Sequence, residues 1–149
     1  MKSACLGSKY AAMQMMEQEQ GGNIVNNSSV ASLEGDSNEV DYCAAKGGVI
    51  LLTKATTLDL APSGILVNCI CSGEIDTPMI GSVLECEERI RKSYLQSRPM
   101  DSGRVGTFRE TANASSFPAS GQSSFTTGST PVVDGGRTAG THLKLWASS

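Results

Sequence analysis

The chain has 149 residues, of which 39% are hydrophobic and 18% charged, with a formal net charge of -3. This length suits one domain with a core of its own, and the composition excludes disorder along the whole chain. The acidic balance argues against nucleic acid as a partner. We also expect no membrane partner, because the chain has neither a run of Lys or Arg nor an apolar run of membrane-spanning length.

Residues 4–19 predict the first helix, because Leu6, Tyr10, Met13 and Met16 recur at helical spacing before a polar run and a double glycine. A methionine cluster of this kind is more typical of core filling than of a cofactor site. Residues 23–26 then predict a short buried strand that leads into the polar sequence Asn-Ser-Ser.

Residues 42–61 form the strongest predicted helix, which Pro62 and the glycine that follows would end. This helix is apolar nearly all round, so we expect it to be buried or packed against another subunit. The apolar run at residues 65–70 is typical of a parallel strand covered on both faces. Strand, helix and strand joined by short turns predict a βαβ unit, and the loop at residues 71–78 follows its second strand.

Residues 80–97 alternate charged and apolar positions and predict one amphipathic, mostly exposed helix. Such a helix fits either a lid over a site or a plain surface helix. Residues 107–119 predict a further helix that Pro118 must end or kink. A last strand and tight turn are expected at residues 130–136.

The cysteine pattern predicts neither a disulfide framework nor a metal site. Five cysteines are an odd number, and the chain contains no Cys-x-x-Cys pair and no Cys/His cluster. Cys69 and Cys71 would lie on one side of the strand that contains them, which is typical of packing. A reducing compartment such as the cytoplasm fits this pattern best.

Tyr42 and Lys46 lie four residues apart in the predicted helix and therefore on one face of it. A nearby ammonium favours the phenolate, so the pair is suited to proton transfer if a substrate reaches it. The alternative is an ordinary helix with a solvated lysine and a packed tyrosine. The spacing alone favours that alternative.

The order of several motifs resembles the active-site half of the short-chain dehydrogenase/reductase family. Gly22-x-Ile-Val-Asn-x-Ser28-Ser29 precedes Tyr42-x-x-x-Lys46, and three further motifs follow: Gly64-Ile-x-Val-Asn68, Gly73-x-Ile75-x-Thr77 and Val133-Asp134-Gly135-Gly136. The resemblance implies an α/β fold over residues 1–140, a partial Rossmann-like, doubly wound parallel sheet of about three strands with flanking helices. Residues 141–149 are expected to form a loose tail.

The resemblance also implies an NAD(P)-dependent oxidoreductase that interconverts an alcohol and a carbonyl. Ser29 matches the serine that hydrogen-bonds the substrate oxygen, Tyr42 the acid/base, and Lys46 the lysine that holds the nicotinamide ribose. The loop residues implied to bind the cofactor are Gly73, Ile75 and Thr77. Small-molecule alcohols or carbonyls are the implied substrates, and the implied homo-oligomer, a dimer or tetramer, would form through helices 4–19 and 42–61.

Some family features are not found in this sequence. The glycine-rich turn T-G-x-x-x-G-x-G, the Asn-Ala-Gly motif and the residue that selects NAD or NADP have no match. Ser72 precedes Gly73 where the family has proline, and Pro118 replaces a leucine. We therefore expect a C-terminal portion of the domain without its N-terminal βαβ units. Two alternatives stay open: an inactive fragment that retains a dimerisation surface, and an epimerase or dehydratase that uses the same Tyr-Lys pair.

Overall fold

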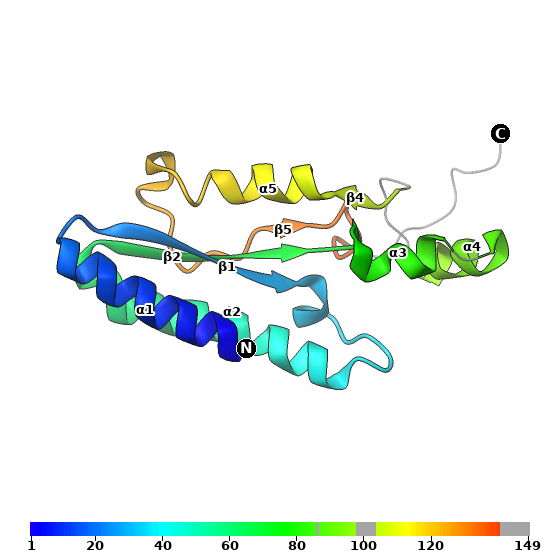
Figure 1. Cartoon of the computed structure of the whole chain (residues 1–149), viewed down its shortest axis with the longest axis horizontal. Helices are drawn as coiled ribbons and strands as arrows, with labels where there is room; N and C mark the ends of the chain where they lie inside the picture. The colour runs from blue at the N-terminus through cyan, green and yellow to red at the C-terminus, as the bar shows by residue number, and fades with distance from the viewer. Residues whose placement is uncertain (86, 98–103, 141–149) are drawn as a thin grey trace.

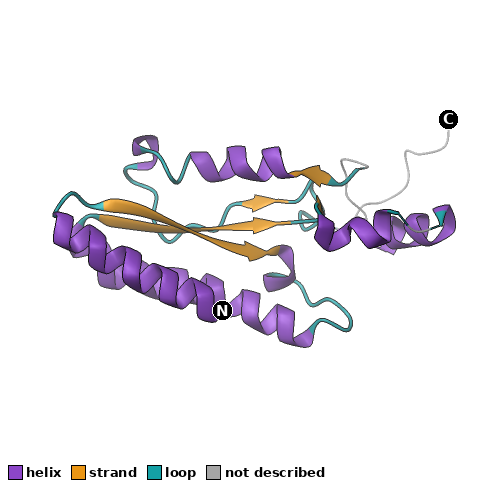
Figure 2. Cartoon of the chain, in the orientation of Figure 1, coloured by secondary structure: helices purple, strands orange, loops and turns teal. Residues whose placement is uncertain are grey.

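A computed structural model of the protein describes residues 1–85, 87–97 and 104–140. Three parallel strands, β1 (Gly22–Ser29), β2 (Ile65–Ser72) and β5 (Val132–Val133), form a sheet in the order β1-β2-β5. Helices flank both faces of this sheet (Figure 2). The predicted α/β class, with a partial parallel sheet of three strands, is confirmed.

The helices form two unequal layers around the sheet. The long helices α1 (Lys2–Gln18) and α2 (Val40–Leu60) lie side by side on one face, and α5 (Phe108–Ser116) lies on the other (Figure 1). β1 and β2 pair in parallel along their whole lengths, and α2 is the connection between them. The predicted βαβ unit is therefore present.

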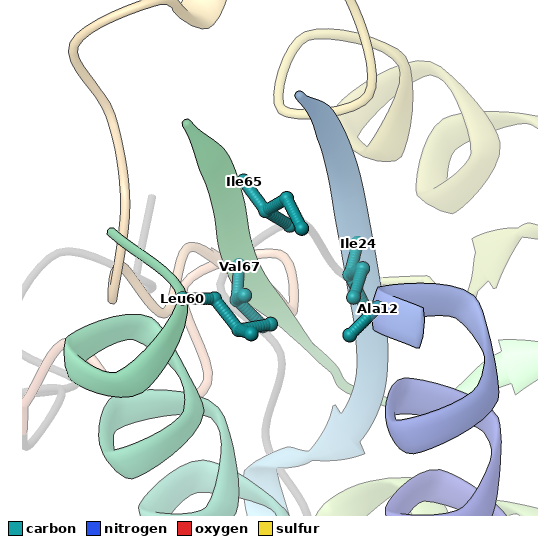
Figure 3. Packing of buried hydrophobic residues seen from close by; sticks show 5 residues of the cluster. All are labelled: Ala12, Ile24, Leu60, Ile65 and Val67. Carbon is teal, nitrogen blue, oxygen red and sulfur yellow. The ribbon is translucent and has the colours of Figure 1, made fainter. Parts of the chain in front are cut away.

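The main apolar cluster lies between β1, β2 and the layer of α1 and α2. Ile65 and Val67 of β2 are fully buried, and their alternate positions on the strand place both side chains on the face that α2 covers. Figure 3 shows them packed with the other cluster members, Ala12, Ile24 and Leu60. This face holds the sheet and the two long helices together.

Buried polar side chains also link the same three elements. Ser8 of α1 donates a hydrogen bond to Oδ1 of Asn26 on β1 (3.3 Å), and Nδ2 of Asn26 donates to Oγ1 of Thr53 on α2 (3.0 Å). All three residues are buried. Since a buried amide without partners is costly, this network fixes how α1 and α2 sit on the strand.

Gly21 permits the turn that leads into β1. Its φ is +66°, and a Cβ at this position would lie 2.6 Å from the carbonyl oxygen of Gly64, which precedes β2. An L-residue there would be strained and would also collide with neighbouring backbone. The glycine therefore lets the two strands begin side by side.

The predicted single helix at residues 80–97 is wrong, because two helices occupy this region. α3 (Pro78–Leu84) ends before a break, and α4 (Glu88–Ser97) begins after it. Glu85 directly follows α3, and Glu87 directly precedes α4. Negative charge is unfavourable at a helix C-terminus and favourable at an N-terminus, so these residues favour an end followed by a new start.

Other elements differ from the prediction in their bounds. β1 and β2 continue to Ser29 and Ser72, while the last strand is limited to Val132–Val133. A second small sheet, β3 (Ile75–Asp76) with β4 (Gly106–Thr107), was not predicted, because two-residue strands leave no periodic signal. α5 ends before Pro118, as expected. The predicted tail at residues 141–149 lies outside the described residues.

The expectation that the methionines of α1 fill the core holds for Met15, which packs against the apolar cluster, but not for Met13 and Met16. Tyr10 and Met13 are more than half exposed, and Leu6 and Met16 are also exposed. Leu51 and Leu58 of α2 are exposed in the same way.

In the described part of the chain, no helix is long and apolar enough to cross a membrane.

Candidate active site

The carboxyl ends of the three strands meet at one edge of the sheet. Ser29 of β1 pairs with Ser72 of β2, which pairs with Val133 of β5. An open cleft of about 920 Å³ lies at this edge, where open α/β sheets commonly bind ligands. Every residue assigned to catalysis or cofactor binding from the sequence lines this cleft: Ser29, Tyr42, Lys46, Gly73, Ile75 and Thr77.

The two adjacent serines of β1 have different roles in the structure. Ser28 is almost fully buried, and its hydroxyl donates to the carbonyl oxygen of Lys46 (2.8 Å), which fastens the end of β1 to α2. The hydroxyl oxygen of Ser29 instead accepts a hydrogen bond from the backbone N–H of Ala31 (3.2 Å). A hydroxyl that accepts in this way still has its own hydrogen to donate, so Ser29 can donate to a ligand oxygen in the cleft.

Tyr42 and Lys46 lie one turn apart near the start of α2. The Lys46 ammonium donates to the carbonyl oxygen of Asn27 (3.1 Å), a hydrogen bond that holds it at the end of β1. Its Nζ lies 5.6 Å from the centroid of the Tyr42 ring. The helix and the strand end therefore place a cation, a phenol and the Ser29 hydroxyl along one cleft.

The turn after β5 supports the loop that carries Gly73. The Gly73 N–H donates to the carbonyl oxygen of Val133 (3.0 Å), and a Cβ on Gly73 would lie 2.8 Å from the Cβ of Asp134. The Asp134 carboxylate accepts hydrogen bonds from the N–H of Gly136 and from the N–H and hydroxyl of Thr138. Burial raises the pKa of Asp134, but these hydrogen bonds outweigh it and lower the pKa overall.

Three charged residues at the cleft were not identified from the sequence. Arg137, in the segment after β5, donates from Nη1 to Glu74 (2.8 Å) and from Nη2 to Asp36 (3.1 Å). The pairs join residues 63 and 101 positions apart, so no local pattern predicts them. Burial works against the charge of Arg137, but the carboxylates of Glu74 and Asp36 raise its pKa.

Cys69 and Cys71 pack on one side of β2 against Val49 and Ile50, as their spacing predicted. The interaction between the two thiols and burial raise the pKa of the Cys69 thiol, and the same interaction lowers the pKa of Cys71. The four cysteines of the described residues are free. The same residues contain no group of three or more His, Cys, Asp or Glu side chains arranged to hold a metal ion.

Known proteins resemble this chain over most of its length. Residues 1–138 match the family model described as enoyl-(acyl carrier protein) reductase. A 3-oxoacyl-(acyl-carrier-protein) reductase of Chlamydia muridarum is 40% identical over 135 residues, which are 88% of this chain and 52% of that protein. A 2-keto-3-deoxy-L-fuconate dehydrogenase of Xanthomonas campestris pv. campestris is 42% identical over 120 residues, 77% of this chain and 39% of that protein.

Among solved structures, the acetoin dehydrogenase of Enterobacter cloacae superposes with a TM-score of 0.79 at 35% identity, covering 97% of this chain and 55% of that one. The chain thus spans about half the length of the curated relatives that it matches. The family model covers far more than half of the chain. The parallel sheet and the order of the motifs in this chain agree with that match. The chain belongs to the short-chain dehydrogenase/reductase family.

Proposed function

We propose that this site serves an NAD(P)-dependent oxidoreductase that interconverts an alcohol and a carbonyl. The observation that carries the proposal is the common cleft of Ser29, Tyr42 and Lys46 at the carboxyl ends of the strands. The names of the similar proteins, a reductase and dehydrogenases, support the same reaction class.

The cleft suits the nicotinamide end of the cofactor. Its volume falls in the range of ligand sites, roughly 300–1,000 Å³. The ammonium of Lys46 is available at its edge for ribose hydroxyls, and Gly73 brings backbone to the lining of the cleft. Ile75 and Thr77 would contact the nicotinamide itself. NAD or NADP, when bound, supplies or accepts the hydride.

The protein side chains would manage the proton and the charge on oxygen. Ser29 donates a hydrogen bond to the substrate oxygen and holds it in place. The Tyr42 hydroxyl gives its proton to that oxygen during reduction, or removes the proton during oxidation. Lys46 stabilises the tyrosinate that remains after the proton has left.

The decisive experiment substitutes Tyr42 by phenylalanine in a version of the protein that includes an N-terminal dinucleotide-binding half. We expect kcat for carbonyl reduction to fall by about 100-fold or more, because general acid catalysis contributes factors of this size. Tyr10→Phe is the matched control, since Tyr10 is exposed on α1, outside the cleft, and its loss should leave kcat unchanged. Equal turnover by Tyr42→Phe would refute the assignment.

A second candidate function is self-association: the 149-residue chain would form an oligomer and would not catalyse a reaction by itself. It is favoured by the exposed apolar side chains of α1 and α2, which include Leu51 and Leu58. Such a surface suits a homo-oligomer that packs these helices against their copies. Sedimentation should then detect a dimer or tetramer that Leu58→Glu dissociates.

Calorimetric titration separates the two candidates for the 149-residue chain. Micromolar binding of NADH or NADPH would contradict a purely associating fragment. An oligomer that binds neither cofactor would support it. Monomeric behaviour at high concentration would contradict the proposed surface.

A further inference from the structure

Arg137 joins two segments of the chain on opposite sides of the candidate active site. One is the segment 33–39, which leads into α2 and Tyr42, and contributes Asp36. The other is the loop after β2, which contributes Glu74 directly after Gly73. All three charged residues line the cleft.

The ion pairs are almost entirely shielded from water. The side chain of Arg137 is 8% exposed, and those of Asp36 and Glu74 are 15% and 7% exposed. Each terminal nitrogen of the guanidinium binds a different carboxylate, Nη1 to Glu74 and Nη2 to Asp36. A planar fork of this kind fixes the direction of both partners. Screening by solvent is weak at such a site, so the pairs restrain both segments.

Without the guanidinium, two carboxylates would lie near each other in the cleft with little solvent. Glu34 adds a third negative charge that acts on Arg137. Removing one member of a buried ion pair leaves uncompensated charge, which is strongly destabilising. The two segments would then separate or take up water. The guanidinium of Arg137 therefore compensates the repulsion between the carboxylates of Asp36 and Glu74.

Each segment transmits its position to a residue of the proposed site. The Asp36 N–H donates to Sγ of Cys43 (3.5 Å), the neighbour of Tyr42 in the first turn of α2. Glu74 lies between Gly73 and Ile75, and its carbonyl oxygen accepts from the N–H of Gly106 on β4 (2.9 Å). The position of Arg137 is thus linked to the tyrosine on one side and to the cofactor loop on the other.

We propose that Arg137 is a positioning residue that sets the tyrosine-bearing start of α2 against the loop of Gly73 and Ile75. This role rests on the proposed oxidoreductase function. Arg137 acts through its two carboxylate partners, and we assign it no contact with the reacting atoms. Lysine cannot replace it fully, because a single ammonium lacks the fork that reaches both carboxylates.

The first test measures amide hydrogen exchange in the 149-residue chain and needs no turnover. In Arg137→Met, exchange should rise by more than about tenfold in residues 33–39 and in residues 73–77, and by a smaller factor in β2. Lys54→Met is the matched control, because it also removes one positive charge, and Lys54 is exposed on α2 outside the cleft. It should leave both segments protected.

Partial variants make the test independent of whether Arg137→Met folds. Asp36→Asn should raise exchange in residues 33–39 alone, and Glu74→Gln in residues 73–77 alone. Arg137→Lys should restore protection to one segment. Unchanged exchange in Arg137→Met, or a uniform rise that includes β2, would overturn the proposal.

The second test uses the version that carries an N-terminal dinucleotide-binding half. Arg137→Met should raise the KM for the cofactor as well as lower kcat, at a temperature where the protein is fully folded. A purely structural role would reduce the active fraction and leave KM unaltered, which would contradict positioning. If the unsubstituted version has no turnover, the proposed function fails, while the exchange data still decide whether Arg137 holds the two segments.

Discussion

On one face of the sheet, α1 and α2 are held by buried apolar and hydrogen-bonded side chains, whereas on the other face α5 itself contributes no buried residue. Ile65 and Val67 are fully buried beneath the first layer. In α5 no residue is buried, and Phe108 is 70% exposed. Thr107 and Glu110 instead form a capping box at the start of α5, and Arg104 pairs with Glu110 (2.6 Å).

The residues of the proposed site come from both sides of the sheet, which differ in how they are packed. Tyr42 and Lys46 belong to the firmly packed layer, and Ser29 ends a strand that this layer covers. Thr111 and Ala112 of α5 line the same cleft from the lightly packed side. The groups assigned to proton transfer therefore lie on elements that the packed layer holds, and a hydrogen bond to Asn27 also holds Lys46.

Removing apolar volume beneath the first layer should have the largest effect on stability. Ile65→Ala is expected to lower the free energy of unfolding by about 2–5 kcal/mol, because it leaves a cavity at a fully buried position. Denaturant unfolding measures the change. Phe108→Ala on α5 is the control and should cost less than about 1 kcal/mol. Equal losses in the two variants would contradict the difference between the layers.

The polar network of the first layer should matter somewhat less. Asn26→Ala removes the partner of both Ser8 and Thr53, and leaving such buried groups unsatisfied costs about 1–3 kcal/mol. Asn27→Ala provides the comparison, since Asn27 is exposed and contributes only its backbone carbonyl to Lys46. Denaturant unfolding of both variants under the same conditions measures the loss of unfolding free energy in each. A loss in Asn27→Ala as large as in Asn26→Ala would show that the network is not responsible.

The sequence predicted those parts of the fold that depend on local patterns. Apolar runs and glycine turns predicted β1, α2 and β2, and Pro118 predicted the end of the α5 region. Tyr42 and Lys46 were candidates because of their spacing, and the motif order around them added Ser29. The structure places all three along one cleft. Their roles in catalysis stay predictions.

The features that were missed depend on contacts between distant residues. The pairing of Arg137 with Asp36 and Glu74 has no local signature, because each partner is an ordinary charged residue in a loop. The sequence pattern also did not predict that the side chains of Met13 and Leu58 are exposed. Apolar periodicity identifies a face that packs, but it does not identify what covers that face.

The capping box makes the stability of α5 depend on pH. The hydrogen bond from Arg104 and those from Thr107 lower the pKa of Glu110 to about 2, from an ordinary value of 4.5. A carboxylate with a depressed pKa stabilises the fold above its ordinary pKa and loses that contribution as the pH falls through its folded value. The stability difference between the unsubstituted chain and Glu110→Gln should therefore shrink between about pH 5 and pH 2.

Thermal unfolding at a series of pH values measures that difference. Because Glu110 is exposed to solvent, added salt should reduce it as well. Asp76→Asn changes an exposed carboxylate at the neighbouring strand β3 and is the control. A difference for Glu110→Gln that stays constant down to about pH 2 would mean that the capping box does not stabilise α5 through its charge.

The smallest effect is expected on the outward side of α2. Leu58 is 77% exposed, so Leu58→Ala removes little buried area and should change the free energy of unfolding by no more than about 0.5 kcal/mol. The measurement must be made at a concentration where sedimentation detects monomer alone, because association would add stability that grows with the logarithm of protein concentration. At high concentration the same substitution should lower the melting temperature if the outward face packs against a second copy. A loss above about 2 kcal/mol in the monomer would mean that Leu58 belongs to the core, and the outward face would then no longer be available to a partner.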